Sequence, residues 1–475
     1  MNADRFKEYD NDVKQLVLNF EDAQRQGLHP YYDMDEMEII IDFYLESADA
    51  DMLEKSVVYG EQLFPQSTSM RLRRAHLLCT KERFSEAYAI LSDLERLEPD
   101  NTDVLYALGA VCSALEQPRK AIRYYQMASV DQYELDTIYS NIADEYFKLF
   151  MFKESRMYAR KALKVNPDCE RALYMLSDSF FEDGAYDEAE HFFGQFVKDH
   201  PYSKVGWYCL AMCYMDASLF EKAIDALEYA IAIDKFFIRA YEQVCECYMQ
   251  LNDIGKAAAV LNEATAYADD KAVLFCHIGD IYRESSNLNT GLAYYRKAVA
   301  ADPRYDEAWI KMALCYVGLD AKGDAVDAVK KALQINTYSP QILSHAAVVY
   351  ALCANDDAAE DLFQTTVEAF PDFDLNWTLY ADFLIDRSRI EEALDIISKG
   401  LSECADPLDL HIRQAYCYFV LGRRNLLFDA VRACLYDSHH GAKHLLEYCP
   451  GMAEDLDVMN VIDSYYHDKE IHNDI

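Results

Sequence analysis

The sequence predicts an all-α protein, an α-solenoid in which helix pairs of 34 residues stack one after another. Three observations lead to this prediction. Small residues, large apolar residues and prolines return at fixed places in a 34-residue frame that needs no insertion or deletion. Within each unit the apolar residues form two stripes at helical spacing. The chain also has 475 residues, more than one compact core usually serves, so a repeat array or several domains are expected.

The frame starts at Met34 and gives twelve units that end at Gly441. The eighth position is small in eleven of the twelve units, the twentieth is small in ten, and the eleventh is Tyr in eight. All three tryptophans occupy the fourth position, and six prolines occupy the thirty-second. The expected units begin at residues 34, 68, 102, 136, 170, 204, 238, 272, 306, 340, 374 and 408.

Each unit is interpreted as two helices joined by a turn. Positions 4, 7, 8 and 11 form the apolar stripe of the first helix, and positions 20, 24 and 27 form that of the second. In the fifth unit, Ala189 is expected to let the neighbouring helix approach, and Phe193 to fill the layer between pairs. Pro201 cannot continue a helix and therefore ends the unit.

A stack of helix pairs needs caps at both ends. Residues 1–33 predict an N-terminal capping helix that Gly27 and Pro30 terminate. Residues 442–475 predict one or two C-terminal capping helices and a frayed tail from His467. The apolar stripe of the N-terminal helix consists of Phe6, Tyr9, Val13, Leu16, Val17 and Phe20.

The pattern W-x-x-L-A-x-x-Y at Trp207–Tyr214, followed by Ala223 and Leu227, resembles the tetratricopeptide repeat family. The pattern F-x-x-I-G-x-x-Y at Phe275–Tyr282, followed by Gly291, resembles it as well. The resemblance covers 408 of the 475 residues. It implies a right-handed superhelix whose concave groove binds extended peptides or partner helices.

Charge restricts the expected partners. The chain has 45 basic and 83 acidic residues, a net charge of −38, which disfavours nucleic acid and anionic membrane surfaces and favours basic segments of other proteins. The N-terminus lacks the basic start and apolar run of a secretory signal, so a cytoplasmic location is expected. The uncharged stretch from Ala332 to Asn355 contains too many polar residues for a membrane span.

The fourteen cysteines form no CxxC motif, and they are expected to be core residues. Four of them share the tenth position of their units, where other units carry apolar residues: Cys213, Cys247, Cys315 and Cys417. A metal site at His439, His440 and His444 is disfavoured because Gly441 interrupts the helix that would hold it and no further ligand completes a set.

A ligand is expected on the first helix of each unit, at positions 2, 5, 9 and 12, which share a face away from the core stripe. We call this the first-helix face. In the family that it resembles, this face lines the groove. Its ninth position is acidic in six of twelve units, and aromatic residues and methionines accompany the acids. A single carboxylate there is most simply a solvated group; the set as a whole favours binding, centred on residues 103–250.

The predicted peptide-binding residues are Tyr106, Asp144, Phe147, Tyr174, Asp178, Phe181, Tyr208, Met212, Glu246, Asp280 and Asp382. Stacked units would align these carboxylates and attract Lys or Arg, while the rings accept apolar or guanidinium groups. The Lys and Asn clamp with which some family members hold chaperone tails is missing, since positions 5 and 9 of the third unit are Tyr106 and Ala110.

Two functions are consistent with these features. The first is a non-enzymatic scaffold or adaptor that binds a basic or amphipathic segment of another protein in an acidic, aromatic groove. The alternative is a structural subunit of a multiprotein assembly that acts through its outer surface or its capped ends. Phosphate-loop and nucleophile-elbow motifs are absent, so no enzyme activity and no cofactor are expected. The oligomeric state, and whether the chain's own termini fill the groove, stay open.

Overall fold

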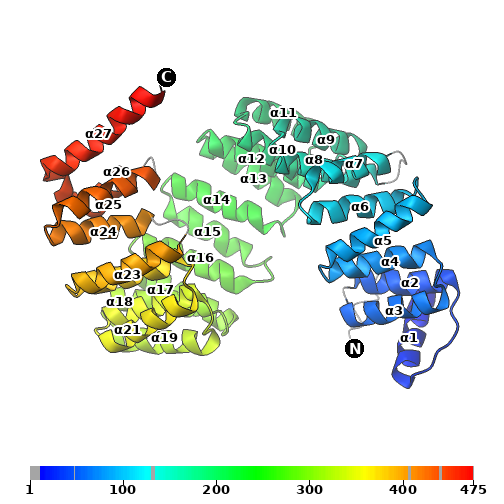
Figure 1. Ribbon diagram of the computed structural model, residues 1–475, viewed down its shortest axis with the longest axis horizontal. Helices are drawn as coiled ribbons and strands as arrows, with labels where there is room; N and C mark the ends of the chain where they lie inside the picture. The colour runs from blue at the N-terminus through cyan, green and yellow to red at the C-terminus, as the bar shows by residue number, and fades with distance from the viewer. Residues whose placement is uncertain (1–10, 48, 130–133, 405–407, 438–440, 474–475) are drawn as a thin grey trace. The chain divides into compact units, whose positions relative to one another are not determined.

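A computed structural model describes residues 11–47, 49–129, 134–404, 408–437 and 441–473. These residues form helices and connecting turns without a β-strand, so the all-α prediction is confirmed for them. Twelve consecutive helix pairs, α2/α3 to α24/α25, lie in order along this part of the chain (Figure 1). The chain divides into two compact units, Met1–Asp234 and Lys235–Ile475, and each is described by itself.

The first helices of the pairs are α2 (Met34–Glu46), α4 (Thr68–Thr80), α6 (Thr102–Ala114), α8 (Leu135–Lys148), α10 (Glu170–Glu182), α12 (Lys204–Asp216), α14 (Ile238–Gln250), α16 (Lys271–Glu284), α18 (Asp306–Gly318), α20 (Pro340–Leu352), α22 (Asp374–Asp386) and α24 (Leu408–Val420). The second helices are α3 (Ala50–Leu63), α5 (Phe84–Leu97), α7 (Pro118–Ala128), α9 (Phe152–Val165), α11 (Tyr186–Asp199), α13 (Phe220–Ile233), α15 (Ile254–Ala264), α17 (Leu288–Ala301), α19 (Lys322–Ile335), α21 (Asp356–Ala369), α23 (Ile390–Glu403) and α25 (Arg424–Asp437).

The core follows the repeat frame. Ala189 and Phe193, the small and large residues of the fifth unit, are both completely buried. The tryptophans fix the start of their helices, because each indole Nε1 donates a hydrogen bond to the carbonyl oxygen of the proline six residues earlier. These bonds are Trp207 to Pro201 at 2.9 Å, Trp309 to Pro303 at 3.1 Å and Trp377 to Pro371 at 2.7 Å. The proline and the tryptophan therefore together stabilise the connection between consecutive repeat units.

The prediction of core cysteines is confirmed for ten of the fourteen, the four at the tenth position included, whereas Cys79, Cys169, Cys353 and Cys404 are only partly buried. Cys213, Cys247, Cys315 and Cys417 are all buried. Burial raises the thiol pKa of Cys247 and of Cys315 to about 11 and that of Cys417 to about 12. Since the thiolate is the reactive form, these side chains behave as small apolar residues at neutral pH.

The turn inside eleven of the described pairs contains a residue in the left-handed conformation. From the second unit to the twelfth it occupies the fifteenth position, and only two of these eleven residues are glycine. They are Glu82, Glu116, Phe150, Gly184, Ser218, Asn252, Ser286, Asp320, Ala354, Ser388 and Gly422. A left-handed residue with a Cβ atom is less stable than glycine there, so nine turns retain some backbone strain.

Replacing Ala354 with Gly is expected to stabilise the C-terminal compact unit, Lys235–Ile475, by about 0.5–1 kcal/mol. Ala354 has a φ of 61° and is exposed, and relief of its left-handed strain, about 1–2 kcal/mol, exceeds the greater chain entropy of an unfolded glycine. Chemical denaturation measures the change. Ala351→Gly, three residues earlier inside α20, is the control and should destabilise by about 1 kcal/mol. Equal effects of the two substitutions would contradict the strain.

Helices outside the twelve pairs lie at both ends of the chain. At the start, α1 (Asn11–Gln26) buries Val17 and Phe20 completely, and Phe20 contacts the rings of Tyr32 and Tyr44. It ends at Gln26, directly before Gly27, whose φ is 65°. Phe6 and Tyr9, which the sequence assigns to the same stripe, lie outside the described residues.

The C-terminal segment consists of α26 (Gly441–Tyr448), the 3₁₀ helix η2 (Pro450–Glu454) and α27 (Leu456–Asn473). The last of these continues through Asn473, beyond the point at which the sequence predicts a frayed tail. Among the described helices, none combines the length and the apolar character that a membrane span requires.

Candidate protein-binding face

The first-helix face takes part in stacking more than the sequence suggests. Within each compact unit, several first helices contact the first helix of the next repeat unit, as in α8 and α10 or α18 and α20. Fifth-position residues are buried in six units: Ser140, Cys276, Ile310, Ser344, Thr378 and Ile412. The expectation that this whole face stays clear of stacking is therefore wrong at the fifth position. The ninth and twelfth positions keep part of their surface exposed.

Three of the six ninth-position acids form ion pairs with the sixth position of the next repeat unit. Each pairs with a base at the sixth position of the next unit, 31 residues further along the chain. The closest distances are 2.6 Å from Arg73 Nη2 to Asp42 Oδ2, 2.6 Å from Lys311 Nζ to Asp280 Oδ2 and 2.8 Å from Arg413 Nη2 to Asp382 Oδ2. These carboxylates join neighbouring first helices and already have a cation.

The Asp280 pair belongs to a larger polar cluster. The Tyr295 hydroxyl donates to Asp280 Oδ1 at 2.7 Å, and Lys311 Nζ also lies 2.7 Å from Glu307 Oε1. Burial and the neighbouring Asp280 carboxylate raise the pKa of Tyr295, so its phenol keeps its proton at neutral pH. The cluster fixes the contact between α16 and α18.

Asp144 also has cations of its own chain. Its Oδ2 lies 3.0 Å from Lys148 Nζ and 3.6 Å from Arg171 Nη2. Arg171 donates to Asn141, which in turn donates to the Tyr106 hydroxyl at 3.2 Å. Tyr106 and Asp144 are thus linked across α6, α8 and α10.

Asp178 differs from these acids. It is exposed and forms no ion pair with any residue that the structure describes, and the same holds for Glu182, one turn along α10. Partial loss of solvent around its carboxyl group and the negative charge of Glu182 both raise the pKa of Asp178 above its usual value. Asp178 and Glu182 are neighbouring carboxylates that lack a cation among the described residues and repel each other. A Lys or Arg side chain bound beside them would reduce this repulsion.

Aromatic residues lie near this pair of acids. Tyr174, Phe181 and Tyr208 are partly buried, and Tyr186 is exposed. Tyr174 and Tyr208 meet edge to face with ring centroids 6.1 Å apart, and Phe181 lies 5.8 Å from Tyr186. Met212, from α12, is partly buried as well. Phe147 packs on Phe152 at 5.5 Å in the preceding unit. Glu246, in the other compact unit, is exposed and accepts a hydrogen bond from Gln250.

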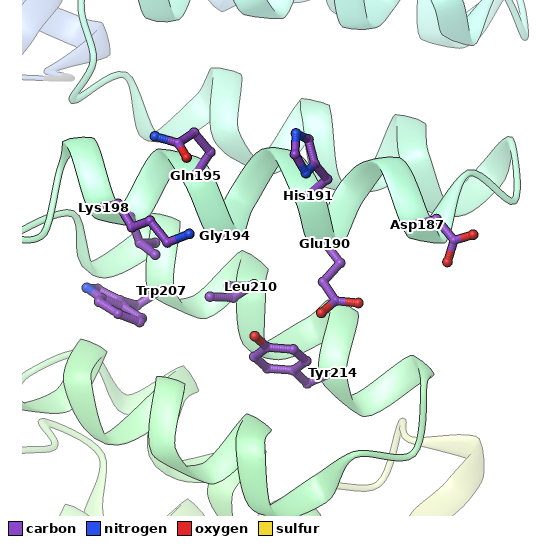
Figure 2. Close-up of a pocket in the computed structure, with 10 residues that line it drawn as sticks. Asp187, Glu190, His191, Gly194, Gln195, Lys198, Trp207, Leu210 and Tyr214 are labelled. Carbon is purple, nitrogen blue, oxygen red and sulfur yellow. The ribbon is translucent and has the colours of Figure 1, made fainter.

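The structure contains hollows that the sequence did not predict. One of ≈ 620 Å³ lies between α11 and α12, where Glu190, Lys198, Trp207 and Tyr214 line it (Figure 2). Figure 2 shows Glu190 and Tyr214 reaching toward the same space from the two helices, beside Gly194, which has no side chain to fill it.

A second hollow, of ≈ 580 Å³, lies on the first-helix face of α18 and α20. Glu307, Lys311 and His345 are among the side chains that line it. It lies beyond residues 103–250, where the site was expected. The signal that could have found it is the row of polar residues at positions 2 and 6 of these two units, which received less weight than the ninth position.

The metal site that the sequence disfavours, at His439, His440 and His444, is described only in part. His439 and His440 lie outside the described residues, and His444 is exposed. Within the described ranges no three His, Cys, Asp or Glu side chains are grouped as a metal ion would require.

Helix pairs of 34 residues, with small residues where helices approach closely and proline between repeat units, are the features of tetratricopeptide repeats, and the family comparisons support this assignment. A family model described as tetratricopeptide repeat matches residues 277–340. A second model, described as anaphase-promoting complex, cyclosome, subunit 3, matches residues 148–230. Together these findings support a scaffold for protein–protein interaction as the general class of function.

Three other proteins are similar in sequence to part of this chain. Anaphase-promoting complex subunit 3 of Schizosaccharomyces pombe is 26% identical over 144 residues, which are 30% of this chain and 22% of that protein. Protein O-mannosyl-transferase TMTC3 of Homo sapiens is 22% identical over 339 residues, 68% of this chain and 37% of that protein. Protein RRP5 homolog of Mus musculus is 21% identical over 48% of this chain and 13% of its own length. The matches therefore span well under half of each relative.

Among solved structures, the APC/C hetero-tetramer Cut9-Hcn1 aligns over 88% of this chain and 93% of that chain, with 13% identity and a TM-score of 0.34. A tetratricopeptide repeat protein of Parabacteroides merdae aligns over 50% of this chain and 94% of that chain, with 15% identity and a TM-score of 0.39.

Proposed function

We propose that this chain is a non-catalytic scaffold that binds a Lys- or Arg-containing segment of another protein on the first-helix face of α10 and α12. The observation that carries the proposal is the unpaired Asp178 and Glu182 beside Tyr174 and Tyr208. A cation placed there gains two carboxylates, and aromatic rings accept its apolar stem or its guanidinium face. The similarity of residues 148–230 to anaphase-promoting complex subunit 3 supports a place for this face in a multiprotein assembly.

The other predicted groove residues have supporting roles in this proposal. Tyr106, Asp144 and Phe147 would extend the surface toward α6 and α8, with Asp144 already shared between two bases. Asp280 and Asp382 hold neighbouring repeats together, so a guest would have to compete with a cation of the same chain for them. The proposed contact is therefore concentrated at Asp178 and Glu182 rather than spread along a row of acids.

The test is a selection of peptides on the immobilised full-length protein. Selected peptides should be enriched in Lys or Arg next to an apolar residue. The variant Asp178→Asn/Glu182→Gln is expected to weaken the best peptide about tenfold, because it removes the paired charge that the cation contacts. The matched control, Glu221→Gln/Asp225→Asn, changes two exposed acids at the same spacing on α13 and should alter affinity less than twofold. Equal losses would refute the site.

Stability separates loss of binding from loss of fold. Since the folded-state pKa of Asp178 is raised, its ionised form costs folding free energy at neutral pH, and this cost disappears as the pH falls through the raised pKa. Asn carries no such cost, so Asp178→Asn should keep or raise the melting temperature while it weakens the peptide. A lower melting temperature would indicate that Asp178 is a structural residue instead.

A further inference from the structure

The second helices of the third and fourth repeat units, α7 and α9, carry a group of basic residues, although the net charge of the chain is −38. Helix α9, FKESRMYARKALKV, has five basic residues and one acid. At 100° per residue, Lys153, Arg160 and Lys164 lie within about 40° of one another on this helix. Arg119, on α7, occupies the repeat position of Lys153, and Arg123 that of Met157. We call Arg119, Arg123, Lys153, Arg160 and Lys164 the basic stripe.

The helices that carry the basic stripe are in contact. Gln126 Nε2 on α7 donates to the Tyr158 hydroxyl on α9 at 3.0 Å. On its other side α9 contacts α11 through Arg160, whose guanidinium lies 5.2 Å from the centroid of the Phe192 ring. The stripe therefore continues from one second helix to the next within the same compact unit.

The cations of the stripe are available to a partner. All five are exposed, and none forms an ion pair with a carboxylate among the described residues. Two cations of α9 lie outside the stripe. Arg156 is buried and pairs with Asp183 at 2.6 Å, and Lys161 lies over the Tyr158 ring, 4.1 Å from its centroid.

The surface between these cations is hollow and partly apolar. A hollow of ≈ 400 Å³ lies along α9, and its lining consists of Lys153, Arg156, Met157, Arg160, Lys161 and Lys164 of α9 with Glu188 of α11. Met157 is 46% exposed in the middle of the stripe. Phe150, in the turn before α9, is 79% exposed. Exposed apolar side chains among unpaired cations are typical of a docking surface more than of a solvated helix.

The stripe is bounded by negative charge, which limits the size of its ligand. The repeat positions of Lys153 and Met157 are Asp187 and His191 on α11, and Glu221 and Asp225 on α13. Helix α9 has fourteen residues and is therefore about 21 Å long, about two to three Debye lengths at physiological salt. A long polyanion would run onto the acidic neighbours, whereas a short acidic segment would not.

We propose that the basic stripe binds a short acidic segment of a partner protein that carries apolar residues between its carboxylates. The carboxylates pair with Lys153, Arg160 and Lys164, and an apolar side chain packs on Met157 in the hollow. This surface is distinct from the first-helix face and opposite to it in charge, so the two can hold different segments. The outer surface then contributes to assembly in addition to the proposed contact at Asp178.

Fluorescence anisotropy with a labelled twelve-residue peptide of six Asp or Glu and two Leu tests the proposal on the full-length chain. We expect a Kd of about 10 µM at 150 mM salt, which rises with salt. Lys153→Glu/Lys164→Glu should weaken binding at least tenfold. The control, Arg96→Glu/Lys330→Glu, makes the same change of charge on exposed second-helix positions, Arg96 at the repeat position of Lys164, and should stay within twofold.

Three further measurements can overturn the proposal. A peptide with Ser in place of Leu should bind about fivefold more weakly, and equal binding would remove Met157 from the site. A DNA duplex or phosphatidylserine vesicles that bind the same stripe more tightly than the peptide would make it a general polyanion surface. Sedimentation that shows wild-type dimers, and monomers for Lys153→Glu/Lys164→Glu, would make a second copy of this chain the partner.

Discussion

Replacing Asp382 with Asn is expected to lower the free energy of unfolding of the C-terminal compact unit by about 3 kcal/mol. Asp382 receives two hydrogen bonds from Arg413, at 2.9 and 2.8 Å, and a third from the Tyr448 hydroxyl at 2.7 Å. The Arg413 side chain is only 13% exposed, so a neutral amide takes the closest counter-charge from a mostly buried guanidinium and leaves it only Asp409, 3.4 Å from Nη1. The loss is large because removing one partner of such a pair strands the other.

The same carboxylate connects α22 to the C-terminal helices. Tyr448 is the last residue of α26, and its ring meets that of Tyr416 on α24 with centroids 5.6 Å apart. Burial and the Asp382 charge raise the pKa of Tyr448, so the phenol remains a donor at neutral pH. Tyr448→Phe removes one of three bonds to Asp382 and should cost about 1 kcal/mol.

Chemical denaturation monitored by circular dichroism measures these changes. The matched control is Asp178→Asn, the same substitution at the same position of the repeat frame, where no cation of the described chain is in contact. It should not lower stability. If Asp382→Asn and Asp178→Asn had equal effects, the ion pair between units would contribute nothing to folding.

These two aspartates show what the sequence could and could not predict. The repeat frame places both at the ninth position, and the sequence alone therefore gives them the same role. Their difference comes from the sixth position of the following unit, which is Arg413 after Asp382 and Cys209 after Asp178. A single-unit view cannot find this partner, because it depends on how far one first helix is rotated against the next.

A signal for the pairs was nonetheless present. Lys or Arg occurs at the sixth position in three units only, as Arg73, Lys311 and Arg413. Each of these units follows one with an acid at its ninth position. Comparison of consecutive units would have separated the acids that hold the stack together from those that remain for a ligand.

The helical class and the stacking of pairs could be predicted because they depend on volume and spacing alone. A small residue at position 8 or 20 allows two helices to approach each other closely, and it can be recognised in any single repeat unit. The fifth position could not be placed in the same way. Its residues range from Tyr106, partly exposed, to Cys276, completely buried, so composition does not tell which side of the helix contact it faces.

Replacing Gly279 with Ala is expected to destabilise the C-terminal unit by about 2 kcal/mol, although glycine inside a helix normally costs about 1 kcal/mol relative to alanine. A Cβ atom on Gly279 would lie 2.5 Å from Cε1 of Tyr295, closer than carbon atoms approach. The ring cannot move away easily. Tyr295 is completely buried, and its hydroxyl bonds to Asp280 at 2.7 Å.

The two residues match each other in size. Tyr occupies position 24 in two units, as Tyr125 and Tyr295, and in both the eighth position is glycine, Gly109 and Gly279. A Cβ atom on Gly109 would likewise lie 2.5 Å from its tyrosine. Units with Leu at position 24 have Ala or Cys at position 8, so the volume is shared between the two helices of a pair.

A double-mutant cycle tests this compensation. Tyr295→Leu opens space, so Gly279→Ala should cost much less in its presence than in the wild type, with a coupling free energy of about 1–2 kcal/mol. Gly194→Ala is the control for helix propensity: a Cβ atom there would meet nothing within 4 Å, and the substitution should stabilise its unit by up to about 1 kcal/mol. Additive effects of Gly279→Ala and Tyr295→Leu would show that the Tyr295 ring is not the reason for glycine at position 279.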